Sequence, residues 1–155
     1  MYRKGRLEMN IQTKYLGEIA IDERKIIHFL TGIPGFPNEK EFVLMDLPDT
    51  PIFQVLQSIK TPTVAFIVSN PYQIYPDYSI ELDDNLIESL QIKEVKEVAV
   101  VAIVTLKQPF YISTLNLKAP IVINTSLGQG KQYILNTEAY SSKAPITPQS
   151  VEREG

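Results

Sequence analysis

Short apolar runs separated by turn residues dominate this sequence and constrain its fold more than any other feature. About nine or ten such runs have the length of a β-strand, and only one segment has helical spacing. A parallel, doubly wound sheet needs strands that alternate with long helices, and this alternation is absent. The sequence therefore predicts an all-β, mainly antiparallel fold, either a small β-barrel-like domain or two packed sheets.

The clearest pattern lies in residues 116–124, where every second residue belongs to an apolar face. That face holds Leu115, Leu117, Ala119, Ile121 and Ile123. A period of two is typical of a strand with one buried face, and Pro120 marks an edge or a bulge because it cannot donate to a ladder. Residues 125–132 contain turn-forming Ser and Gly, and residues 133–135 are apolar again. The stretch predicts a half-buried strand, a long turn and a returning strand.

The remaining elements are predicted from continuous or alternating apolar runs. The candidate strands are 11–15, 19–21, 26–30, 42–47, 52–59, 64–68 and 95–106, the last being the expected central strand. Leu82, Leu86 and Leu90 recur every four residues and predict one short helix, whose N-terminus Asp83 and Asp84 would cap. The Pro- and Tyr-rich segment 71–78 is expected to be an ordered loop.

Residues 116–124 read Asn-Leu-Lys-Ala-Pro-Ile-Val-Ile-Asn, and this string resembles the signature of the FliW family, the flagellar assembly factors of bacteria. Other segments agree in the same order along the chain. They are Gly-Ile-Pro-Gly-Phe at 32–36, Phe-Val-Leu at 42–44, Pro-Asp-Tyr at 76–78 and the apolar run at 98–106. The resemblance covers residues 9–140 and implies a compact β-barrel-like domain there. We expect 1–8 to be an N-terminal extension and 141–155 to be a C-terminal tail with little packing of its own.

Composition narrows the possible functions. The 155 residues contain no cysteine and one histidine, so a zinc site of the usual kind is not expected, and the lack of cysteine is compatible with a reducing cytoplasm. No apolar run approaches the roughly 20 residues of a membrane span. The net charge of −3 suits a basic protein partner better than nucleic acid. We therefore expect a cytoplasmic protein without a cofactor, a metal, a membrane contact or direct nucleic-acid binding.

No pattern indicates an enzyme. His28 sits alone in an apolar run, and a histidine on a strand explains it better than a catalytic pair. Gly128 to Lys131 resembles part of a phosphate loop, but Thr125 stands where such a loop needs Gly, so a hairpin turn is the better interpretation. Helix capping explains Asp83 and Asp84 better than cation binding does. A site built from carboxylates alone stays open as an alternative.

A partner-binding surface is the remaining hypothesis. Tyr72, Tyr75 and Tyr78 occupy a Pro-rich segment, and acidic residues follow it. Tyrosines are common at interface hot spots, although they could equally pack against the sheet and leave the acids merely solvated. The resemblance favours binding. The candidate partner-binding residues are Tyr75, Asp77, Tyr78, Glu81 and Asp83.

The resemblance also implies the partners. Proteins similar to this one are not enzymes; they bind CsrA, a dimeric repressor of flagellin translation, and they bind flagellin. The implied function is a partner switch that antagonises RNA binding by CsrA and couples flagellin translation to export, with the free chain a monomer. A strand edge near Pro120 could receive flagellin by strand addition. The alternative is a chaperone-like module that binds flagellin and has no regulatory partner.

Overall fold

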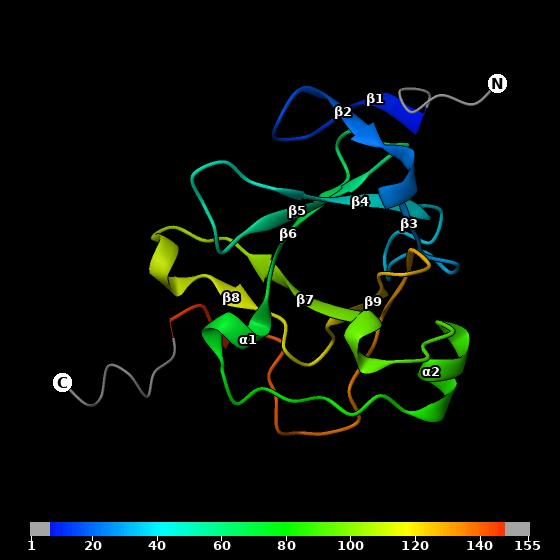
Figure 1. Ribbon diagram of the computed structural model, residues 1–155. Helices are drawn as coiled ribbons and strands as arrows, with labels where there is room; N and C mark the ends of the chain where they lie inside the picture. The colour runs from blue at the N-terminus through cyan, green and yellow to red at the C-terminus, as the bar shows by residue number, and fades with distance from the viewer. Residues whose placement is uncertain (1–6, 148–155) are drawn as a thin grey trace.

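A barrel of seven strands forms the body of the protein, whose computed structural model describes residues 7–147 (Figure 1). The strands of the barrel are β3 (Ile27–His28), β4 (Glu41–Asp46), β5 (Gln54–Ser58), β6 (Ala65–Ser69), β7 (Val98–Thr105), β9 (Ile121–Asn124) and β10 (Gln129–Gln132). Neighbouring strands are antiparallel except for β3 and β10, and the pairing of β7 with β9 closes the ring. The predicted all-β, mainly antiparallel barrel is confirmed.

Smaller elements surround the barrel. β1 (Glu8–Gln12) and β2 (Glu18–Asp22) form a separate hairpin, and β8 (Thr114–Leu115) and β11 (Ala144–Pro145) extend the sheet beyond β7. The helices are α1 (Pro71–Ile74) and α2 (Asp84–Ser89), and 3₁₀ turns occur at η2 (Glu23–Lys25), η3 (Val95–Glu97) and η4 (Phe110–Ile112). Figure 1 shows α1 and α2 joined by a long segment that crosses the barrel on the side away from β1 and β2.

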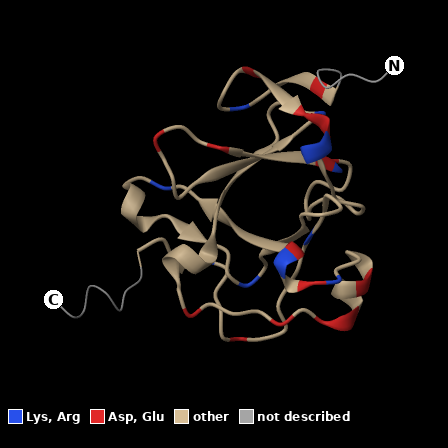
Figure 2. Ribbon diagram, viewed as in Figure 1, with Lys and Arg blue, Asp and Glu red and all other residues tan. Residues whose placement is uncertain are grey.

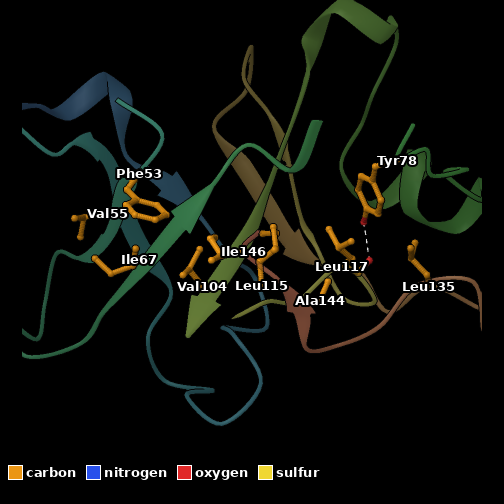
Figure 3. Close-up of a cluster of buried hydrophobic side chains, with 11 residues drawn as sticks. Phe53, Val55, Ile67, Tyr78, Val104, Leu115, Leu117, Leu135, Ala144 and Ile146 are labelled. Atoms are coloured by element: carbon orange, nitrogen blue, oxygen red, sulfur yellow. Dashed lines mark hydrogen bonds between the residues drawn. The ribbon is translucent and has the colours of Figure 1, made fainter. Parts of the chain in front are cut away.

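Alternation along the strands produces two larger apolar cores, and two smaller clusters lie under the β1–β2 hairpin and α2. The barrel interior contains Phe29, Phe42 and Leu56, all completely buried, with the two phenylalanine rings edge to face at 5.3 Å. The outer face of β5, β6 and β7 carries a second core that includes Val55 and Tyr78 (Figure 3). Because each large apolar side chain contributes about 1.5–3 kcal/mol when it is fully buried, both cores stabilise the fold.

The predicted strand at 116–124 is wrong in its first half. Only Ile121–Asn124 forms a strand, because the side-chain oxygen of Asn116 accepts hydrogen bonds from the amides of Lys118 and Ala119 and turns the chain. The predicted apolar face is buried, but the strand is not half-buried, since its other face is covered by α2. The returning strand begins at Gln129, four residues before the predicted start at Tyr133.

The short helix predicted from the spacing of Leu82, Leu86 and Leu90 is confirmed as α2, and the Asp83 carboxylate caps it by accepting from the Leu86 amide at 2.8 Å. The loop expected at 71–78 contains a second short helix, α1. Its signal in the sequence is Asn70 followed by Pro71, because the Asn side chain caps the helix and proline suits its first position.

The expectation of little packing after residue 140 is wrong for Ala144 and Ile146. Ala144 pairs with Leu115 through β11 and β8, and the side chains of Ala144 and Ile146 are buried in the second core. Residues 1–6 and 148–155 lie outside the described part of the chain. The division into segments 1–8, 9–140 and 141–155 otherwise stays a prediction.

Candidate partner-binding surface

The segment that joins α1 to α2, together with α2 itself, carries five acidic side chains and no basic one; we call it the acidic flank (residues 77–88). No Lys or Arg occurs between Thr61 and Ile92 in the sequence. The acids of the flank are Asp77, Glu81, Asp83, Asp84 and Glu88, and all five are exposed. In Figure 2 the acidic positions of this segment lie along one side of the ribbon, while most Lys and Arg positions lie elsewhere. Like charges gathered on one face produce a local negative potential.

One buried and two partly buried tyrosines anchor the beginning of the flank. The Tyr78 side chain is 3% exposed, and its hydroxyl donates to the Leu117 carbonyl at 2.7 Å (Figure 3). The Tyr75 hydroxyl donates to the Pro145 carbonyl at 2.7 Å. The Tyr140 ring lies 4.6 Å from the Tyr78 ring, centroid to centroid. Burial raises the pKa of Tyr78 above its ordinary value, so its hydroxyl stays a protonated donor.

Helix α2 anchors the other end. Leu86 and Leu90 are buried against Val122 of β9, and Asp83 caps the first turn. Between the two anchors the Tyr133 hydroxyl donates to the Glu81 carbonyl at 3.3 Å. The flank is therefore held along its length, and a partner that binds it meets acids whose backbone is already positioned.

The flank borders two grooves. Ile80 and Leu82 line a groove of about 810 Å³ that reaches β7 and α1. The same two residues also line a second groove, of about 570 Å³, which Glu81, Asp83 and Tyr133 border as well. A partner surface at the acids would thus lie over the second groove, while the first has a mainly apolar lining.

The structure exposes some of the candidate residues and encloses others. Asp77, Glu81 and Asp83 lie on the same exposed segment, and Asp84 and Glu88 extend it. Tyr78 is enclosed, so its side chain supports the segment instead of facing a partner, as the packing interpretation of the tyrosines expected. Tyr75 is half-buried and uses its hydroxyl within the fold. Partner binding by these residues stays a prediction.

The other sequence candidates have structural explanations. His28 lies on strand β3, with its Nδ1 3.7 Å from an Oε2 of Glu41, and both side chains are about half exposed. Gly128 ends the turn of the β9–β10 hairpin with φ of +67°. Within residues 7–147, no three His, Asp or Glu side chains gather to hold a metal ion. Nor does that part of the chain contain a helix long and apolar enough to cross a membrane.

An apolar patch beside η4 was missed from the sequence. Leu106, Phe110, Tyr111 and Ile112 are each about half exposed or more. Only Phe110 has a ring partner there, Phe53, with the two centroids 5.8 Å apart. The exposed large side chains of this patch form a second candidate surface for a protein partner.

The fold is that of a small, mainly antiparallel β-barrel that carries an anchored, acidic flank. Comparison with known proteins identifies the family, since residues 10–146 match the model of the family described as FliW protein. A flagellar assembly factor FliW of Oceanobacillus iheyensis is 56% identical over 89% of this chain and 94% of its own length. One from Geobacillus kaustophilus is 48% identical over 94% of this chain and all of its own.

A solved structure agrees with these sequence relatives. The crystal structure of a flagellar assembly factor FliW superposes with a TM-score of 0.86 at 45% identity, covering 91% of this chain and 99% of the other. The chain therefore belongs to the FliW family of flagellar assembly factors.

Proposed function

We propose that this flagellar assembly factor binds the translational regulator CsrA through the acidic flank, and that flagellin binds in its place when flagellin is abundant. The single observation that supports the proposal is the flank itself, in which five exposed acids occur without a basic residue between Thr61 and Ile92. An acidic face of this kind suits a basic protein partner, because complementary charge speeds encounter and fixes orientation.

The physical effect on CsrA would be electrostatic. A regulator that holds RNA phosphates must be basic where it binds them. Docking the acidic flank beside that surface lowers its positive potential and opposes phosphate binding without filling the RNA groove. In this proposal the chain acts in the cytoplasm as a monomer, contacts no nucleic acid directly, uses no cofactor and catalyses no reaction.

Coupling of translation to export requires that the two partners exclude each other. Newly made flagellin occupies the protein, CsrA stays free and translation stops; export of flagellin releases the protein, which then captures CsrA. Mutual exclusion of this kind is linked binding, so each partner weakens the other by the same factor.

A second candidate is a chaperone-like module that shields flagellin and has no regulatory partner. The exposed apolar patch of Leu106, Phe110, Tyr111 and Ile112 favours it, because such patches commonly bind apolar surfaces of other proteins.

Native mass spectrometry of the purified chain with purified CsrA, with and without flagellin, separates these functions. We expect a complex with CsrA that disappears as flagellin is added. Binding of flagellin alone would replace the proposal with the chaperone-like candidate. Absence of both complexes at micromolar concentrations, or one complex containing all three proteins, would contradict it.

A further inference from the structure

The barrel is incompletely paired where β6 meets β7, and we call this place the seam. These strands pair only through Val68 with Ile103 and Ser69 with Ala102. The same register would set Pro71 opposite Val100, but Pro71 has no N–H and begins helix α1. Within the described residues no strand pairs with this edge of β7 at 98–101, because β9 occupies the opposite edge.

The backbone direction of β7 shows which groups face the seam. The Glu97 carbonyl accepts from the Thr125 amide, and the Ile103 carbonyl accepts from the Asn116 amide, so odd-numbered residues face β9 and β8. Alternate residues of an antiparallel strand point to opposite edges, so the backbone of Val98 and Val100 faces the seam. The Val98 amide bonds to Val95, which leaves the Val98 carbonyl and both polar groups of Val100 directed toward it.

An apolar groove of about 810 Å³ runs along this edge. Leu44 and Ala99 line it from the side of the barrel interior, and Ile87 and Val95 line it from outside. Val95 is 89% exposed, which is unusual for a large apolar side chain beside a groove. Four residues of strand edge extend about 13 Å, enough to pair with a short segment. An open strand edge beside an apolar groove is the geometry used to receive an added strand.

Charge around the groove restricts the occupant. Residues 77–97 contain seven carboxylates against two lysines, a net charge of −5. The charged side chains that line the groove itself are Lys93 and Glu94, and Lys96 lies 3.7 Å from Glu94. The excess negative charge therefore comes from the acids of the flank beside the groove. A segment with Lys or Arg beside its apolar residues therefore fits better than an acidic one.

We propose that the seam binds an extended, cationic segment of a partner protein, which adds a strand along β7 at 98–101. Its alternating apolar side chains occupy the groove, and its Lys or Arg side chains face the acidic flank. The N–H and C=O of Val100, which Pro71 leaves without a strand partner, form hydrogen bonds with the added strand. The inference does not depend on CsrA or flagellin being the partner, and the strand β9, paired on both edges, is excluded as the receiving strand.

The test uses the full chain and a capped peptide, Lys-Val-Thr-Val-Thr-Val-Lys, followed by NMR hydrogen exchange. We expect saturating peptide to slow exchange of the Val100 amide at least tenfold. The amides of Ala99 and Val101, which already face β9, should change little. A peptide with N-methylated backbone amides and a peptide with Glu in place of Lys serve as controls, and each should bind at least tenfold more weakly.

Matched variants locate the site. Val95→Lys places a positive charge at the groove and should weaken binding of the peptide at least fivefold. Ile134→Lys, also at an exposed apolar residue, should leave the affinity for the peptide unchanged. Unaltered exchange at Val100, equal binding of either control peptide, equal effects of the two variants, or no binding at millimolar peptide would each overturn the proposal. None of these results bears on whether CsrA binds the acidic flank.

Discussion

The two sides of the barrel differ in how completely their strands pair. On one side, β4 and β5 pair from Phe42 with Ser58 to Asp46 with Gln54, and β5 is buried along nearly its whole length. On the other, β6 and β7 pair only beside the α1 turn. Figure 1 shows β4 and β5 side by side, while the chain from β6 crosses β7 in this view and continues into α1. One side closes the structure, and the other leaves backbone and apolar surface available to partners.

Polar contacts reinforce the closed side. The completely buried side chain of Gln57 accepts from the Lys14 amide at 2.9 Å and donates to the Pro62 carbonyl at 3.1 Å, so it links β5 to the β1–β2 hairpin. Glu39 accepts from the hydroxyls of Ser58 and Thr61, and these hydrogen bonds hold the pKa of its carboxyl below the ordinary value. These contacts stabilise β4 and β5, whereas within residues 7–147 the edge of β7 at the seam lacks strand pairing. The flank contributes to the frame through its buried residues Tyr78 and Leu86.

The largest effect is expected from Leu56→Ala. Leu56 is completely buried in the barrel interior, so its truncation leaves a cavity and should lower the free energy of unfolding by about 2–5 kcal/mol. Val95→Ala at the seam, at an exposed side chain, should change it by less than about 0.5 kcal/mol. Urea denaturation followed by circular dichroism measures both. Similar losses for the two variants would contradict the division between a stabilising side and a binding side.

A smaller effect is expected from Tyr78→Phe. The change removes the hydroxyl that donates to Leu117 and leaves a buried carbonyl without that partner, so the loss should be about 1–3 kcal/mol. Tyr72→Phe is the matched control, since Tyr72 packs beside Tyr78 but remains partly exposed. The same urea measurement applies. If Tyr78→Phe is as harmless as its control, the flank is not anchored through this hydrogen bond.

Local patterns predicted much of the fold. Alternation located most strands because a period of two is a property of neighbouring residues, and leucines four apart located α2. The position of β10 in the sequence could not be predicted, because its residues are largely polar and show no apolar alternation. Contacts with residues far away in the chain make it a strand. Gly130 admits the Phe29 ring, where a Cβ would lie 2.7 Å from Cζ of that ring.

The candidate site was predicted in part. Acidic side chains in a polar loop are normally exposed to solvent, so Asp77, Glu81 and Asp83 could be identified from the sequence alone. The position of Tyr78 depends on Leu117 and Tyr140, residues far away in the chain, and no local pattern indicates that it is enclosed. The seam could not be predicted from the sequence either, because it follows from the register between β6 and β7.

The most direct test of the central claim is Glu81→Lys, whose expected change in stability is as small as that of Val95→Ala. Glu81 is exposed and its side chain is not needed by the frame, so the unfolding free energy should change by less than about 0.5 kcal/mol. Calorimetric titration with CsrA should nevertheless show binding weakened about tenfold. Glu23→Lys, an equal charge change on η2, should bind as the unaltered chain does. Equal affinity of the Glu81→Lys variant and the unaltered chain would show that the acidic flank is not the surface that CsrA meets.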